Sequence, residues 1–186
     1  MRRRWIPGAC FLLAASLAAA AELAGVEMPD MVTVEGRQLV VNGVGLREKM
    51  WVDVYVAGLY LEQKASDARQ ILDSAQIKHL RMQFVYKKVN TKKLTEAWTE
   101  GLEANAPGAM DRLRPGLDQL NSWMEDVTKG DRLSFTSVPG KGLEVVVKGQ
   151  TKGVIEDTEF ASAFWSIFLG EKPPTDKLKD GLLGAG

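Results

Sequence analysis

The 186-residue chain contains one cysteine and one histidine, and it has no excess of charge of either sign. An ordinary zinc site draws its ligands from several cysteine and histidine side chains, so this composition argues against a metal site. Catalysis by a serine-histidine-aspartate triad would depend on His79. This histidine shares a mixed strand face with Arg81, so we expect it to be solvated or locally hydrogen-bonded. The balance of 24 basic and 24 acidic residues indicates no basic surface for nucleic acid.

Sequence motifs for nucleotide cofactors are also missing. The segment Gly43-Val44-Gly45 lacks the third glycine and the following helix of a dinucleotide-binding fingerprint. No phosphate-binding loop of the P-loop type occurs in the chain. We therefore expect the protein to work without a cofactor.

The first 21 residues have the pattern of a secretory signal peptide. A cluster of arginines precedes an apolar run that ends in small residues before Glu22. The run is too short and too rich in alanine to favour the alternative, a permanent membrane span. A lipid anchor on Cys10 is disfavoured because only a few residues separate this cysteine from the arginines. We expect cleavage after Ala21, which leaves residues 22–186 as one exported domain without a permanent span.

Cleavage there would also remove Cys10, the only cysteine. The mature protein would then have neither a disulfide nor a thiol, despite an oxidising destination. Export without disulfides fits a bacterial periplasm at least as well as a eukaryotic secretory route. We therefore expect a periplasmic location.

The rest of the chain alternates between strand and helix patterns. Residues 51–61 are rich in valine, tyrosine, leucine and tryptophan and have no proline, which predicts a central strand covered on both faces. A second extended run, residues 39–47, precedes it, and we expect a tight turn at Glu48-Lys49 between them. Residues 22–30 are expected to be a flexible lead-in. Further strands are expected at 31–35, 37–41, 77–86, 133–138, 143–148 and 153–156, and helices at 66–74, 90–105, 109–127, 157–170 and 175–183. This order predicts an α+β fold, with one antiparallel sheet and helices packed on it.

Arg47 and Tyr55 are the first candidates for a binding site. If the two extended runs pair, Arg47 lies at the end of one strand and Tyr55 lies well inside its partner. A guanidinium beside a phenol and apolar surface is suited to holding a carboxylate or a phenolate. The alternative is structural: Arg47 pairs with Glu48 or Asp53, and Tyr55 fills the core.

Two motifs resemble the opening and closing signatures of the chalcone isomerase superfamily. The first is Gly43-Val44-Gly45-Leu46-Arg47 followed by Tyr55-Val56-Ala57-Gly58-Leu59-Tyr60-Leu61. The second is Phe164-Trp165-Ser166-Ile167-Phe168-Leu169-Gly170-Glu171 and the helix that follows it. The likeness covers roughly residues 30–184. It implies an open-faced β-sandwich, a large antiparallel sheet with helices layered on it and a ligand cleft between them.

The resemblance also implies site residues, although most catalytic residues of the plant enzymes are replaced. Arg47 matches the arginine that stabilises the substrate's phenolate, and Tyr55 stands where the enzymes have threonine, as in the fatty-acid-binding relatives. Trp98 and Asn105 match a tyrosine and an asparagine by spacing, so only the asparagine is kept. Ile167 stands in place of another threonine. Because the lost hydroxyls would orient a water and a ketone oxygen, chalcone cyclisation is disfavoured.

We therefore expect an exported, non-catalytic protein that binds a small amphipathic carboxylate or phenolic ligand, such as a fatty acid, in an apolar cleft. The predicted ligand-binding residues are Arg47, Tyr55, Trp98, Asn105 and Ile167. The expected apolar lining is Trp51, Tyr55, Tyr60, Trp98, Phe164 and Trp165. One alternative is an isomerase or lyase acting on a conjugated ketone, and another is an envelope interaction module whose cleft is filled. The sequence leaves the ligand's identity and the oligomeric state open.

Overall fold

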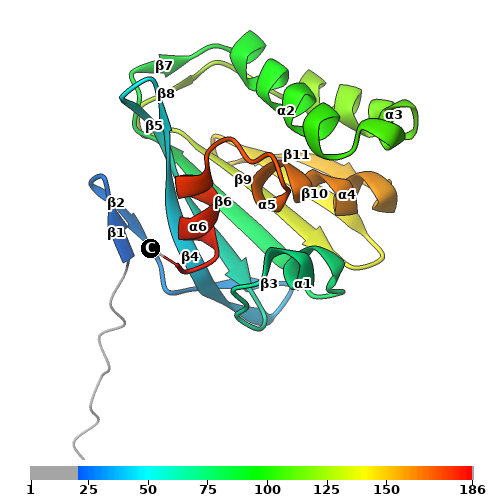
Figure 1. Ribbon diagram of the computed structural model, residues 1–186, viewed down its shortest axis with the longest axis horizontal. Coiled ribbons are helices and arrows are strands. Elements are labelled where there is room, and N and C mark those ends of the chain that lie inside the picture. Colours follow the sequence, from blue (N-terminus) through cyan, green and yellow to red (C-terminus); the bar gives the residue numbers. More distant parts are fainter. Residues whose placement is uncertain (1–20, 186) are drawn as a thin grey trace, which may run out of the picture.

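A seven-stranded antiparallel sheet forms the centre of the protein, in a computed structural model that describes residues 21–185 (Figure 1). Most of the expected signal peptide thus lies outside the described residues. The strand order is β11-β10-β9-β6-β5-β4-β3. The strands are β3 (Met31–Val34), β4 (Arg37–Lys49), β5 (Val52–Leu61), β6 (Lys78–Phe84), β9 (Arg132–Val138), β10 (Gly142–Val147) and β11 (Gln150–Ile155). This confirms the predicted α+β fold with one large antiparallel sheet.

Helices cover one face of this sheet, which we call the inner face (Figure 1). They are α1 (Ala68–Asp73), α2 (Thr91–Asn105), α3 (Met110–Ser122), α4 (Thr158–Phe164), α5 (Ser166–Leu169) and α6 (Asp176–Leu182), with a 3-10 turn at Pro107–Ala109. The main apolar core lies between the helices and inner-face residues such as Leu59 and Phe135. The stripe predicted for α2 is buried there, since Leu94, Trp98 and Leu102 all belong to this core. Within the described residues, no helix is long and apolar enough to cross a membrane.

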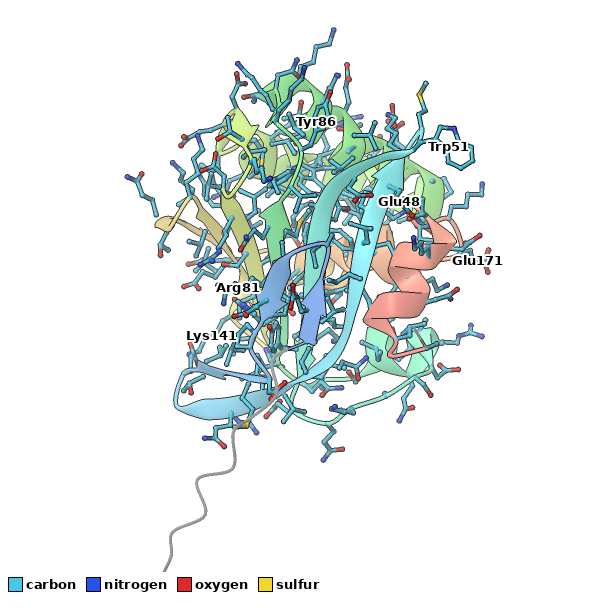
Figure 2. All side chains as sticks on the ribbon, turned by 90° about the vertical axis from the view of Figure 1, so that its left-hand side faces the viewer. Glu48, Trp51, Arg81, Tyr86, Lys141 and Glu171 are labelled. Atoms are coloured by element: carbon cyan, nitrogen blue, oxygen red, sulfur yellow. The ribbon has the colours of Figure 1, made fainter. Side chains whose placement is uncertain are left out.

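The opposite, outer face is partly covered by an N-terminal hairpin (Figure 2). Strands β1 (Ala21–Leu23) and β2 (Val26–Met28) form this hairpin. The expectation that residues 22–30 are a flexible lead-in is therefore wrong. Val26 and Met28 are buried against Leu46 and Val56 of the sheet. The hairpin is therefore held by apolar contacts with residues far along the chain.

The turn between β4 and β5 lies two residues later than expected, at Met50-Trp51. Lys49 pairs with Val52, and both turn residues have left-handed backbone, with φ of 49° and 66°. Trp51 is 99% exposed and projects away from the protein (Figure 2). The expectation that Trp51 belongs to the central strand and lines a cleft is therefore wrong.

Other differences concern the ends of elements. Helix α3 ends at Ser122 instead of 127, because Val127 forms a short strand, β8 (Val127–Thr128), that pairs with β7 (Lys88–Val89). Strand β11 begins three residues earlier than expected because the turn before it lies at Lys148-Gly149, where both φ values are positive. The helix expected over 157–170 divides at Trp165 into α4 and α5.

Candidate functional site

Arg47 and Tyr55 are direct partners in the ladder between β4 and β5. Opposite residues of an antiparallel pair project to the same face, so both lie on the inner face. Tyr55 is 8% exposed and packs edge-on against Phe84, with ring centroids 5.7 Å apart. Arg47 is partly buried. The structure thus brings this predicted pair together.

The guanidinium of Arg47 has no carboxylate partner within 4.0 Å among the described residues. It donates a hydrogen bond to the backbone carbonyl of Glu48. The Glu48 carboxylate instead pairs with Lys177 at 2.6 Å. The ion pair offered by the structural alternative is therefore not formed with the Glu48 side chain.

Burial and charge act in opposite directions on the phenol. Burial raises the pKa of Tyr55 well above its usual value, and the positive charge of Arg47 lowers it by a smaller amount. The phenol is therefore neutral at physiological pH and can donate a hydrogen bond. A cation and a neutral donor on one strand pair are a suitable receptor for a carboxylate.

Helix α6 fixes the strand that carries Arg47. A Cβ on Gly45 would overlap the Leu178 carbonyl, and one on Gly43 would overlap the backbone at Gly181. The two glycines thus let the α6 backbone lie directly on β4. Asn42 completes the contact by donating from Nδ2 to the Leu182 carbonyl at 2.8 Å.

Trp98 occupies the centre of the aromatic core. It is 2% exposed and lies 5.7 Å from Phe135 and 6.2 Å from Phe168, measured between ring centroids. Its indole Nε1–H is buried without a hydrogen-bond partner among the described residues. An unpaired buried donor of this kind costs about 1–3 kcal/mol, so it marks a place where an acceptor would stabilise the protein.

Ile167 and Asn105 have structural contacts. Ile167 is buried and packs against Gly101 of α2. A Cβ at position 101 would collide with the Ile167 side chain. Asn105 donates from Nδ2 to the carbonyls of Gly101 and Lys172, both at 2.9 Å, and accepts from the Lys172 N–H at 2.9 Å. Its amide ties the end of α2 to the loop after α5.

Gly170 belongs to the same junction. Its φ is −67°, so it does not adopt the left-handed conformation for which glycine is often used at a helix end. A Cβ on this glycine would instead overlap the side-chain oxygen of Asn105 and the carbonyl of Ser166. Glycine is required here by close approach and not by backbone conformation.

Two of the hollows in the described part of the chain have walls that include neither Arg47 nor Tyr55. One, of about 310 Å³, lies between α2 and α3 beside Thr95 and Asn121. The other, of about 290 Å³, includes Lys78 and Trp165. Sequence reasoning did not single out Lys78, although a lysine among the apolar residues of an alternating strand is a detectable signal.

Comparisons with known proteins give the chain a family resemblance and a fold. A family model described as chalcone isomerase-like matches residues 20–184. The crystal structure of the Arabidopsis thaliana fatty-acid binding protein AtFAP1 is similar, with a TM-score of 0.67 and 17% sequence identity. The similarity covers 86% of this chain and 92% of the Arabidopsis chain, and at this identity it shows the fold alone. The comparison with curated proteins found no match.

Proposed function

Because the chain belongs to the chalcone isomerase-like family, we propose that it binds a small amphipathic carboxylate, such as a fatty acid, without catalysing a reaction. The observation that carries this proposal is the partly buried Arg47 guanidinium beside the buried Tyr55 phenol. No carboxylate of the described residues pairs with that guanidinium within 4.0 Å. The fatty-acid binding stated for the Arabidopsis protein of the same fold supports the choice of ligand.

The head group of the ligand would take the place of the missing carboxylate. A guanidinium can donate two parallel hydrogen bonds to the two oxygens of one carboxylate. The neutral Tyr55 phenol adds a third donor, since its pKa is raised by burial. Such charge-assisted bonds are strongest where water is partly excluded, as it is beside Tyr55.

The hydrocarbon tail would extend from Tyr55 along the inner face. The side chains beyond it, Phe84 and Trp98, are buried in the main core. A guest therefore enters by displacing side chains between the sheet and α2, which is a change of conformation with a cost. The indole N–H of Trp98 has no hydrogen-bond partner among the described residues, so a water that enters with the guest would accept its hydrogen bond and reduce that cost.

The residues at the positions of the enzyme's hydroxyls support a binding role. Ile167 carries no group that can move a proton, and it is buried. The indole of Trp98 is a donor only. Tyr55 holds its proton more tightly than a free phenol does. None of these three side chains is suited to general acid–base catalysis near neutral pH.

The test is native mass spectrometry of the protein after incubation with palmitate. We expect a one-to-one complex for the natural protein and at least a tenfold weaker one for Arg47→Met, because a partly buried charged hydrogen-bond partner is removed. Lys49→Met is the matched control, since Lys49 is an exposed cation two residues along the same strand. Equal binding by Arg47→Met and the natural protein, or no binding by either, would overturn the proposal.

We also propose that the protein is exported to the periplasm and cleaved after Ala21. The arginine cluster, apolar run and small residues at the start of the chain support this. Fractionation of cells that express the full chain, followed by intact-mass measurement, tests it. A protein that keeps residues 1–21, or that stays in the cytoplasm, would contradict it.

A further inference from the structure

Lys78 is a buried cation with one hydrogen-bond partner. It lies on β6 opposite Leu61 and Ser137, and it is only 6% exposed. Its ammonium donates to the Ser74 carbonyl at 2.6 Å. No carboxylate of the described residues lies within 4.0 Å of that ammonium. A buried charge with so few partners is costly unless an anion or further acceptors complete its surroundings.

A cavity of about 290 Å³ lies beside this lysine. It is bounded by the end of α1, the turn between β9 and β10, and helix α4, with Trp165 and Ser137 in its wall. Exposed residues such as Gly140 and Ser162 also line it, so it is open to solvent. Its size is at the lower end of small-molecule sites.

Two donors in the wall of this cavity can hold an anion, and the Asp73 carboxylate also lines the cavity. Trp165 donates from Nε1 to the Ser137 hydroxyl oxygen at 2.9 Å, which leaves the hydroxyl proton of Ser137 available. The ammonium of Lys78 has three N–H groups, of which the Ser74 carbonyl occupies one. Leu72 adds apolar surface beside these polar groups.

We propose that this cavity binds a small carboxylate, with one or both oxygens held by the Lys78 ammonium and the Ser137 hydroxyl. The short apolar part of the ligand lies against Trp165 and Leu72. A volume of about 290 Å³ has room for a carboxylate with a short hydrocarbon part. The proposed ligand class is a short-chain or similarly compact carboxylate.

The structural role of Lys78 explains only part of its surroundings. Ser74 is the C-cap of α1, and a lysine near a helix C-terminus stabilises the last carbonyls. This contact uses one donor and needs no cavity. Burial lowers the pKa of Lys78, with the nearby charge of Asp73 acting in the opposite direction. A bound carboxylate would raise that pKa, whereas a purely capping lysine would not respond to carboxylates.

This site is separate from the proposed fatty-acid site. Tyr55 and Leu61 mark the two places along β5, since Tyr55 pairs with Arg47 and Leu61 pairs with Lys78. Six residues of strand separate them by about 20 Å. The inference does not depend on the proposed function, and a variant at one place leaves the other intact.

The experiment is a titration of the protein with sodium butyrate, followed by the indole N–H signal of Trp165 in nitrogen-proton correlation spectra. We expect a saturable shift of that signal in the natural protein. The Lys78→Met variant should bind butyrate at least tenfold more weakly, because the charged partner is removed. Lys64→Met is the control, since Lys64 is an exposed lysine nearby in sequence, and Arg47→Met should also leave the shift unchanged.

A second variant keeps the experiment decisive if Lys78→Met does not fold. Ser162→Phe places a large side chain in the mouth of the cavity while keeping Lys78, and it should abolish the shift. No shift in the natural protein, or an equal shift in Lys78→Met, would overturn the proposal. A response to inorganic phosphate without a response to butyrate would overturn the assignment to carboxylates. Loss of palmitate binding in Arg47→Met together with unchanged butyrate binding would show that the two sites are independent.

Discussion

The turn between β4 and β5 makes a stability prediction with a definite sign. Met50 and Trp51 occupy left-handed backbone, with φ of 49° and 66°. A side chain in this conformation costs about 1–2 kcal/mol per residue. Asn-Gly is the sequence that such a two-residue hairpin turn prefers, because both residues tolerate positive φ. The chain has two bulky apolar residues instead.

Replacing Met50-Trp51 with Asn-Gly should therefore stabilise the protein. The two side chains are 84% and 99% exposed, so their removal costs few contacts. The added glycine makes the unfolded chain more flexible, which offsets about 0.5–1 kcal/mol of the gain. We expect a net stabilisation of about 1–2 kcal/mol, or a rise in melting temperature of roughly 2–8 °C for a domain of this size.

Urea unfolding of the natural and variant proteins measures this change. The midpoint should rise while the dependence on urea concentration stays the same, since the exposed area is almost unchanged. The single variants Met50→Asn and Trp51→Gly should each give part of the gain. An unchanged or lower midpoint in the double variant would refute the reasoning, because it would show that these side chains make stabilising contacts.

Three further predictions concern the stability of the fold. Gly45→Ala should destabilise the protein by at least about 2 kcal/mol in thermal unfolding, because the Cβ of the alanine would push α6 away from β4. An unchanged melting temperature would contradict the close contact between Gly45 and α6. Asn105→Ala should lower the free energy of unfolding by about 2–3 kcal/mol, because three hydrogen bonds are lost. Asn105→Asp should recover part of this loss. Equal stability of the natural protein and both variants would contradict a structural role for Asn105. Burial lowers the pKa of His79 from 6.5 to about 4, so the unfolded chain binds more protons between these values. The contribution of neutral His79 to the free energy of unfolding should be fully present above about pH 6.5 and should fall by up to about 3 kcal/mol towards pH 4. His79→Gln should flatten this pH dependence. An equally steep fall in His79→Gln would show that His79 is not its cause.

Much of the fold could be predicted because local patterns agree with the final packing. Leu94, Trp98 and Leu102 repeat at helical spacing, and the structure buries all three. Asn90 supplies the expected N-cap of α2 by accepting from the Lys93 N–H. That Arg47 and Tyr55 lie on neighbouring strands follows from the sequence, but their direct pairing does not, because a turn at Glu48-Lys49 would place Arg47 opposite residue 50. The pairing results from the later turn and from the register shift between Arg47 and Glu48.

The remaining features depend on partners that are distant in the chain. Val26 and Met28 form a strand because Leu46 and Val56 provide an apolar surface for them. The sequence predicts the β4–β5 turn two residues too early, because Met50-Trp51 carries no turn signal. Asn105 could not be recognised as a structural tie from sequence, since its partner Lys172 is 67 residues away.

The positions of the site residues also depend partly on local sequence patterns and partly on partners that are distant in the chain. The exposure of Trp51 could not be predicted without knowing where the turn between β4 and β5 lies. Lys78 is detectable in the sequence as a lysine on an apolar strand face, but its role as a binding candidate comes from the cavity beside it. Whether Trp98, Asn105 and Ile167 contact a ligand stays a prediction.

The central claim is that the Arg47 guanidinium holds the carboxylate of a fatty acid. Its most direct test is the carboxyl signal of palmitate labelled with ¹³C at that carbon, followed by NMR as the pH of the complex is lowered. We predict that the bound carboxyl stays ionised well below the pKa of the free acid in the natural protein and in Lys49→Met, and that this protection is lost in Arg47→Met. A bound carboxyl that titrates identically in all three proteins would contradict the account.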